Sequence, residues 1–300
     1  MDESEIHSMM ELVKIGEKSY YINSPVKIGI YKADDRNVYM IDSGGDKDTA
    51  RKARKILDEN GWILKAIINT HCHADHIGGN RYLQQQMKCK IFANGIEAAF
   101  TSFPILEASF LYGGYPCKDL RHKFLLADKS DVTDITDDSF PKELEIIPLP
   151  GHFFDMIGIR TPDNTVFLAD CISSKNTLEK YQISFMYDVA AYLKTLDMVE
   201  GMEAKFFVPS HAQATKDIKD LIYLNRDKIY EIAEKLILFC SQPLNFEVIL
   251  QKVFKEYHLK MNFEQYVLVG STIRSYLSWL KDIDKITVHF NDNQLLWQRI

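Results

Sequence analysis

The chain has 300 residues, of which 46% are hydrophobic and 26% are charged, and its formal net charge is −6. This is ordinary globular composition, and an acidic chain gives no electrostatic reason to expect nucleic acid as an obligatory partner. No apolar run reaches the ~18 residues of a membrane span, and residues 1–5 are acidic and lack the apolar core of a secretory signal.

The five cysteines are scattered and odd in number, and no two have CxxC spacing. This pattern is typical of reduced thiols and not of a disulfide framework. Since no secretory signal is visible either, we expect a cytoplasmic protein with no membrane partner. The sequence leaves open whether the protein forms a homo-oligomer.

The first part of the chain alternates short β-like segments with turn residues. A helix with one apolar face is predicted at residues 46–60, and Gly61 is suited to end it. A β-branched run at residues 64–68 predicts a strand, and a second helix is predicted at residues 76–88. Before these elements we expect a meander of antiparallel strands at residues 11–15, 20–22, 26–31 and 38–41.

The same alternation continues as far as His211, with a further helix predicted at residues 189–201. Beyond His211 the strand signals stop, and a hairpin is predicted only at residues 285–297. Strands are expected at residues 144–149, 157–161, 165–169 and 206–209. Helices are expected at residues 217–238, 246–257 and 263–280.

This change of character divides the chain into two predicted domains. Residues 1–215 have the alternating pattern of an α/β domain. Residues 216–300 contain helices followed by a hairpin, which predicts a small, mainly helical, winged-helix-like domain. Basic and acidic residues nearly balance there, so packing, dimerisation or a substrate-lid role is favoured over DNA binding.

Residues 71–76, with the sequence HCHADH, place three imidazoles and a carboxylate within six positions. Imidazole nitrogen and carboxylate oxygen both bind Zn²⁺ tightly. A predicted strand precedes the motif, and Gly78 and Gly79 follow it, which is the context of a ligand-bearing loop. We therefore predict a metal site here.

The first metal is expected to bind His71, His73 and one distant residue. His71 and His73 are two positions apart, so on an extended backbone their side chains project to the same side. A catalytic site takes about three protein ligands. His152, at the end of another predicted strand, is well placed to be the third.

A second metal can be held by the remaining polar residues at strand ends. Asp75 and His76 belong to the same motif, and His211 ends the last predicted strand of the α/β domain. Asp170, which closes the predicted strand at residues 165–169, can bridge both ions through its two carboxylate oxygens. Five of the nine histidines are then used.

Five motifs, in this order along the chain, resemble those of the metallo-β-lactamase-fold hydrolase superfamily. They are YMIDSG at residues 39–44, NTHCHADHIGG at 69–79, LPGH at 149–152, FLAD at 167–170 and PSH at 209–211. Together they span most of residues 10–212. The resemblance implies an αββα sandwich with a glyoxalase II-like dinuclear metal site at the edge of its two sheets.

Two such ions lower the pKa of a bridging water to about 7, which supplies hydroxide without a strong base. Asp75, beside this nucleophile, can move its proton. The resemblance implies that flavin-linked di-iron relatives have glutamate at the position of His73. Because this chain has histidine there, we expect zinc, with iron or manganese as alternatives. The expected reaction is hydrolysis of a small-molecule ester, thioester or lactone.

Other functions of the same fold stay open. A phosphodiesterase or nuclease is disfavoured by the acidic chain, and a β-lactamase is disfavoured because Asp170 stands where cysteine or serine variation would be expected. Residues 212–215 do not resemble the glutathione-binding signature of glyoxalase II. An iron-dependent oxidoreductase and a DNA-binding regulator are the remaining alternatives.

Several residues near the motifs have structural interpretations. Asp42 is expected to bind loop backbone and not metal. Cys171 is expected to be a small buried residue, and Cys72 to point away from the neighbouring ligands. Lys175 and Lys180 are expected to be solvated.

Two further sets of residues are less informative. The apolar loop at residues 103–115 is equally consistent with a substrate-binding flap and with core. The remaining histidines lack partners at metal spacing and are expected to be structural or exposed: His7, His122, His258 and His289.

Overall fold

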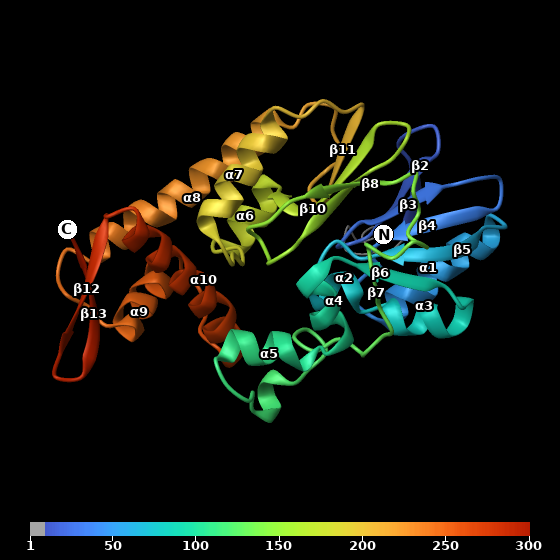
Figure 1. Ribbon diagram of the computed structural model, residues 1–300. Coiled ribbons are helices and arrows are strands. Elements are labelled where there is room, and N and C mark those ends of the chain that lie inside the picture. The colour runs from blue at the N-terminus through green and yellow to red at the C-terminus, as the bar shows by residue number, and fades with distance from the viewer. Residues whose placement is uncertain (1–9) are drawn as a thin grey trace, which may run out of the picture.

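The computed structural model describes residues 10–300, which form an αββα sandwich: two β-sheets lie face to face, and helices cover their outer sides (Figure 1). The first sheet follows sequence order, with an antiparallel meander from β1 to β4 and parallel pairing from β4 to β7. Its strands are β1 (Glu11–Lys14), β2 (Ser19–Asn23), β3 (Ile28–Lys32), β4 (Asn37–Ile41), β5 (Ile63–Ile68), β6 (Lys90–Ala93) and β7 (Thr133–Asp134).

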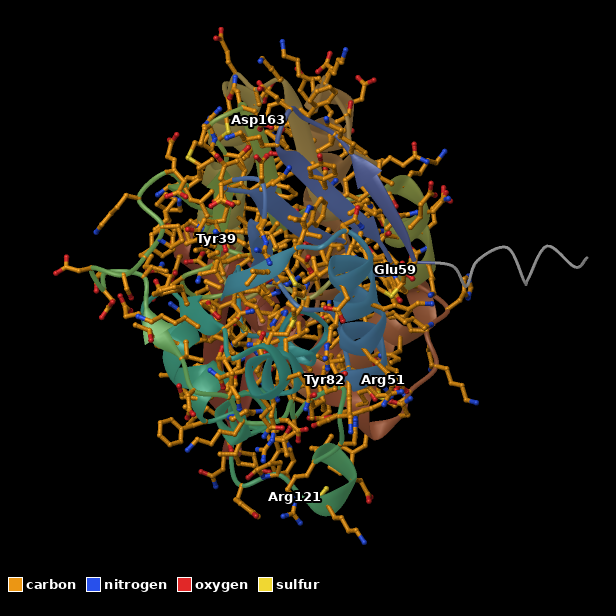
Figure 2. The ribbon with its side chains drawn as sticks, turned by 90° about the vertical axis from the view of Figure 1, so that its right-hand side faces the viewer. Tyr39, Arg51, Glu59, Tyr82, Arg121 and Asp163 are labelled. Carbon is orange, nitrogen blue, oxygen red and sulfur yellow. The ribbon has the colours of Figure 1, made fainter. Side chains whose placement is uncertain are left out.

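The outer face of this sheet is covered by α1 (Lys47–Glu59) and α3 (Asn80–Met87). Asp46 caps α1 by accepting a hydrogen bond from the Thr49 amide, and the apolar face of α1 buries Leu57 against the sheet. Figure 2 is turned toward this side of the molecule, with Arg51 and Glu59 labelled on α1 and Tyr82 on α3. The predicted meander and the predicted helix at residues 46–60 are confirmed.

The second sheet has the order β11-β10-β9-β8. Helices α7 (Val189–Glu200) and α8 (Lys219–Phe239) pack on its outer face. The space between the two sheets is filled by aliphatic and aromatic side chains, such as Ile68 from the first sheet and Phe167 from the second. The strands are β8 (Glu145–Pro148), β9 (Ile157–Arg160), β10 (Thr165–Ser173) and β11 (Phe206–His211).

The C-terminal helices share a continuous apolar core with the second sheet. One cluster of buried side chains joins Leu168 of β10 and Leu196 of α7 to Ile232 of α8 and Leu277 of α10. The division at residues 215 and 216 and the winged-helix assignment stay predictions. The elements after α8 are α9 (Phe246–Glu256), α10 (Phe263–Asp282) and the hairpin of β12 (Ile286–Asn291) and β13 (Gln294–Arg299).

Three local predictions were wrong. The helix predicted at residues 76–88 is divided into α2 (Ala74–Ile77) and α3, because Gly78 and Gly79 pack directly on the backbone of the loop after β4. The strand predicted to close at Ala169 and Asp170 continues to Ser173 through an irregularity at Ala169.

The third concerns residues 103–115, predicted as a loop, which contain the helix α5 (Ile105–Tyr112) between Pro104 and Gly113. Pro at a helix start and Gly in the left-handed conformation at its end both favour such a helix. It packs on α10 and lies below it in Figure 1. The other short helices are α4 (Gly95–Ser102), η2 (Lys118–Leu120) and α6 (Lys175–Tyr181).

Within residues 10–300, none of the helices combines the length and the apolar character that a membrane span requires.

Candidate metal centre

The loop after β5 is fixed by Asp42, at the end of β4. The Asp42 amide donates a hydrogen bond to the Ile68 carbonyl at 3.0 Å. The Asp42 carboxylate accepts hydrogen bonds from the Thr70 amide at 2.8 Å and from the Thr70 hydroxyl at 2.7 Å. The predicted role of Asp42 in binding loop backbone is confirmed, and this contact places His71 at the sheet edge.

The glycines after the HCHADH motif allow two backbone segments to meet. A Cβ atom on Gly78 would lie 2.2 Å from the Gly45 carbonyl oxygen, and one on Gly79 would lie 2.3 Å from that of Ser43. The Ser43 amide in turn donates a hydrogen bond to the His76 carbonyl at 2.8 Å. A larger residue at either glycine would push α2, and with it His76, away from the sheet.

His152 is positioned from the second sheet by a second close approach. Gly151 has φ of +124°, and a Cβ atom there would lie 2.3 Å from the Tyr192 amide nitrogen at the start of α7. The two sheets are joined next to the site, because the Ile157 amide of β9 donates a hydrogen bond to the Thr70 carbonyl at 2.9 Å. His71 and His152 therefore approach from different sheets.

Asp170 is directed by an irregularity in β10. Ala169 has φ of +50°, and the pairing of β10 with β11 shifts register on both sides of it. Such a bulge redirects the following side chain. Beyond the bulge, Ser173 pairs with His211 at the end of β11, so Asp170 and His211 share one edge of the second sheet.

The structure brings together all seven predicted ligands in two groups. His71, His73 and His152 form the first cluster, in which one ligand atom from each lies within 4.8 Å of the others. Nδ1 of His73 lies 3.1 Å from Nε2 of His71 and 3.1 Å from Nε2 of His152. Three ring nitrogens therefore converge on one point.

The second cluster contains Asp75, His76, Asp170 and His211, again with ligand atoms within 4.8 Å of one another. Oδ1 of Asp170 lies 3.1 Å from Nε2 of His76, and Oδ2 lies 3.1 Å from Nε2 of His211. Oδ2 of Asp170 is also 3.7 Å from Nε2 of His152 in the first cluster. Asp170 thus stands between the two clusters.

The donor atoms fit divalent metal ions. Nε2 of His76 and Oδ1 of Asp170 are buried, and neither has a hydrogen-bond partner within residues 10–300. Buried polar atoms without partners are rare and costly, and a cation between them would satisfy both. Two groups of imidazole and carboxylate donors, with one carboxylate between them, fit a dinuclear site.

Burial governs the protonation of the first cluster. It lowers the pKa of His71 and of His73 well below the usual histidine value, and neighbouring histidines lower both further. Burial also lowers the pKa of His152. All three rings are therefore neutral at pH 7, which is the form of histidine that binds metal.

The carboxylates reverse this effect in the second cluster. Burial lowers the pKa of His76, but Asp170, Asp75 and Asp42 more than offset burial and leave that pKa well above its usual value. Burial likewise lowers the pKa of His211, and Asp170 outweighs it. Burial raises the pKa of Asp170, but His211 and His76 bring it well below the usual range. This cluster therefore attracts positive charge.

Three residues beyond the seven also shape the site, through contacts that the sequence did not predict. Oδ2 of Asp42 lies 2.8 Å from Nδ1 of His76, so Asp42 orients a candidate ligand as well as the loop. Glu107, on α5, has its Oε1 atom 3.9 Å from Nε2 of His73. Its pKa is raised well above the usual value by burial. An acidic residue within the apolar run at residues 105–111 was the signal that could have identified it.

Glu97, on α4, supports the same region from behind. Its carboxylate accepts hydrogen bonds from the Cys72 amide at 3.0 Å and from the Asp155 amide at 2.9 Å. Burial raises the pKa of Glu97 to about 7. Glu97 thereby ties the HCHADH loop to the loop that follows His152.

The remaining predicted residues lie outside the two clusters. Cys171 is buried, and Lys175 and Lys180 are exposed, as predicted, and Cys72 is buried as well. His122 lies 3.4 Å from Glu264 on α10, His258 is exposed and His289 is partly exposed. His7 and the acidic start at residues 1–5 lie outside the described residues.

The family model of the metallo-beta-lactamase superfamily matches residues 24–211, more than half of the chain. That range includes strands β3 to β11 and all seven cluster residues. The protein therefore belongs to the metallo-beta-lactamase superfamily.

Three curated proteins are similar to this chain. A linear primary-alkylsulfatase from a Pseudomonas species is 24% identical over 297 residues, which cover 82% of this chain and 56% of that protein. The beta-lactamase-like protein 2 homolog of Drosophila melanogaster is 20% identical over 269 residues, 84% of each chain. A hydroxyacylglutathione hydrolase from Methylobacillus flagellatus is 27% identical over 154 residues, which cover 48% of this chain and 52% of that protein. The chain thus spans about half the length of two of these relatives.

Two solved structures share the fold over almost the whole chain. A beta-lactamase domain protein from Burkholderia ambifaria has a TM-score of 0.73 at 14% identity, covering 97% of this chain and 94% of the other. A metallo-beta-lactamase family protein from Thermus thermophilus has a TM-score of 0.71 at 16% identity, covering 97% of this chain and 98% of the other. At this coverage the shared fold includes the C-terminal helices.

Proposed function

We propose that this protein is a zinc-dependent hydrolase of a small ester or thioester. Its family and its seven converging donor residues support metal-dependent hydrolysis. The name of one relative, hydroxyacylglutathione hydrolase, denotes hydrolysis of an acyl-glutathione, which is a thioester. Imidazole-rich donor sets suit zinc.

The observation that carries this proposal is a cavity that opens onto both clusters. Its volume is about 310 Å³, at the lower end of the range for small-ligand pockets. His73 and His152 of the first cluster and Asp75, Asp170 and His211 of the second all border it. A small substrate in this cavity contacts both clusters at once.

Each cluster residue has a defined part in the reaction. The ions, when bound, act as Lewis acids that polarise a carbonyl oxygen and lower the pKa of water. His71, His73 and His152 would hold one ion, Asp75, His76 and His211 the other, and Asp170 would link the two. The side chain of Asp75 is 49% exposed, so its carboxylate can exchange a proton with solvent.

Hydrolysis adds one water molecule to the substrate. The water oxygen forms a bond to the carbonyl carbon, and the carbon–sulfur or carbon–oxygen bond breaks. The bonding electron pair leaves with sulfur or oxygen, and Asp75 passes a proton from water to that group. The Phe185 ring lies 5.1 Å from the His73 ring and 5.8 Å from the His152 ring, which places an apolar surface beside the reacting atoms.

The direct test is turnover by zinc-loaded protein of matched panels of carboxylic esters, thioesters, lactones, phosphodiesters and β-lactams. We expect hydrolysis of esters, thioesters or lactones with kcat/KM well above that of phosphodiesters and β-lactams. Turnover of phosphodiesters alone would replace this proposal with the nuclease alternative.

A pair of carboxylate variants tests the role of Asp75. Asp75→Asn keeps an oxygen donor but cannot carry a proton, so we expect kcat to fall by about 10²–10⁴-fold with an altered pH profile. Asp46→Asn is the matched control, because Asp46 is also partly exposed near the site but belongs to neither cluster. Equal activity of the two variants would remove Asp75 from proton transfer.

A further inference from the structure

The cavity at the metal centre continues away from the clusters as an apolar chamber between α6, α8 and α10. We define the apolar chamber by six lining residues, all of them at most 7% exposed. Five of the six belong to the large core cluster beneath the second sheet, so the walls are held by packing. The six residues are Leu178, Ile183, Met186, Ile229, Ile232 and Val269.

The chamber runs along α8. Asn225 marks its end near the metal centre, because the Asn225 side chain accepts a hydrogen bond from the Ser173 amide at 3.0 Å, three residues beyond Asp170. Ile232 lies two turns further along the helix, which places it about 10 Å from Asn225 along the α8 axis. The lining residues on α8 therefore span a length that suits several carbon atoms in a line.

The polar groups that border the chamber from α7 and α8 are already bonded within the protein. The Tyr192 hydroxyl donates to the Cys171 carbonyl at 2.8 Å, and the Asn225 amide group donates to the Ser173 carbonyl at 2.8 Å. The Lys228 ammonium donates to Glu231 at 2.6 Å and to Gln182 at 3.0 Å. A polar substrate tail would lose its hydration without gaining these partners, whereas a hydrocarbon tail loses nothing.

A second cavity, of about 410 Å³, adjoins the first at the clusters. The two cavities share six lining residues: His73, Asp75, Tyr181, Phe185, Glu264 and Leu268. The second cavity is also bordered by Gly45, Lys123 and Phe124, and Phe124 is 65% exposed. A leaving group of any length can extend toward solvent here. The two cavities therefore meet at His73 and Asp75, where the two ends of a substrate can separate.

We propose that the apolar chamber binds an unbranched hydrocarbon acyl chain, with the alcohol or thiol leaving group in the second cavity. This inference rests on the proposed ester or thioester hydrolysis and names its substrate class. Residues of α8 and α10 form much of the chamber wall, so the C-terminal helices select the acyl chain. Each methylene that enters the chamber should raise kcat/KM about four-fold.

The test measures kcat/KM of the zinc-loaded full-length protein on 4-nitrophenyl esters from acetate to dodecanoate. We expect kcat/KM to rise with chain length and then to level off or fall once the chamber is full. Ile232→Trp fills the deep end, and we expect kcat/KM on octanoate and longer esters to fall far more than kcat/KM on acetate. Leu238→Trp is the matched control, because Leu238 lies on the same helix but is 59% exposed.

A binding measurement separates this inference from the proposed function. Octan-1-ol has no carboxylate to bind a metal, so calorimetric binding of octan-1-ol reports the chamber alone. We expect binding to the wild type and to Leu238→Trp, and loss of binding in Ile232→Trp. If Ile232→Trp does not fold, Val269→Phe fills the chamber from α10 instead.

The outcomes are distinct. One outcome is that no ester is hydrolysed, while octan-1-ol binds and Ile232→Trp or Val269→Phe abolishes its binding. This outcome refutes the proposed function but not the chamber. The other outcome is that the acetate ester is hydrolysed but kcat/KM does not depend on chain length, or that both filling variants still bind octan-1-ol. Either result overturns the inference and leaves the proposed function standing.

Discussion

Nε2 of His76 lies 3.1 Å from Oδ1 of Asp170, and both atoms are buried without a hydrogen-bond partner in the described part of the chain. The two residues come from different sheets, His76 from α2 after β5 and Asp170 from the bulge in β10. A buried imidazole and a buried carboxylate this close need a positive charge between them, which a proton on His76 or a bound cation can supply. The fold therefore places a buried pair that requires positive charge at the candidate metal centre.

Asp42→Asn tests how His76 is oriented. Asparagine tolerates the left-handed backbone of Asp42, whose φ is +64°. However, only one of its two terminal side-chain atoms, the oxygen, can accept hydrogen bonds. We expect the affinity of the second cluster for zinc to fall about 10–100-fold, with the first cluster little changed. Competition with a chromophoric chelator measures both affinities.

The control for Asp42→Asn is Asp163→Asn. Asp163 also accepts several hydrogen bonds, from the Lys18 amide and the Ser19 and Thr161 hydroxyls, but it lies in the turn before β10, whereas Asp170 lies in the second half of that strand. Figure 2 places Asp163 at the opposite end of the molecule from Arg121. Equal zinc affinity in the two variants would show that Asp42 does not orient a ligand.

Gly151→Ala tests the approach of the His152 loop to α7. The added Cβ would lie 2.3 Å from the Tyr192 amide nitrogen, so the loop must move and carry His152 with it. We expect a loss of stability of roughly 1–3 kcal/mol and weaker metal binding at the first cluster. Chemical denaturation and metal titration measure the two effects.

Gly61→Ala is the control for this substitution. Gly61 has φ of +67° but no atoms within 4 Å of an added Cβ, so it reports backbone strain without a clash. We expect a cost of about 1 kcal/mol and unchanged metal binding. Metal binding that is equally weak in both alanine variants would point to a general loss of stability.

Glu97 predicts a pH dependence of folding. Its folded-state pKa of about 7 lies above the ordinary value of 4.5, so the folded state holds a proton that the unfolded state has lost. Between about pH 4.5 and 7, this group should lower the free energy of unfolding by about 1.4 kcal/mol per unit rise in pH. The stabilisation is complete below that window and lost above it.

Glu97→Gln should remove this contribution. Denaturation of the metal-free protein from pH 5 to 8 should show a flatter profile for the variant than for the wild type. Glu59→Gln, on the exposed side of α1, is expected to leave the wild-type profile unchanged. Parallel profiles for wild type and Glu97→Gln would contradict the buried, protonated state of Glu97.

Removal of metal should destabilise the protein. An ion that binds only the folded state stabilises it by about 2.7 kcal/mol at 100 times its Kd. We therefore expect a chelator to lower the Tm by several degrees and added zinc to restore it. A Tm that does not respond to chelator would show that no ion is bound to the folded protein.

The convergence of the seven candidate ligands was predictable from the sequence because these residues follow strands with clear apolar patterns. His71, His152 and His211 each come at or just after a strand end, and strand ends of facing sheets meet at one edge. Asp42 was also recognisable as a loop residue. Its contact with His76 was not, because that contact depends on how α2 packs.

The surroundings of the centre were less predictable. Glu107 reaches His73 only because α5 forms and packs on α10, which is tertiary information. Ala169 has no sequence signal for its left-handed backbone, so the continuation of β10 to Ser173 was missed. The apolar chamber likewise arises where α8 and α10 pack beside the second sheet, and no single segment encodes it.

The most direct test of the central claim is the metal content of the purified protein, measured by inductively coupled plasma mass spectrometry beside Asp170→Ala. Two clusters joined by Asp170 predict about two zinc ions per wild-type chain and about one or fewer in the variant. A wild-type protein that holds no divalent metal after loading, or an Asp170→Ala variant that keeps both ions, would contradict the account.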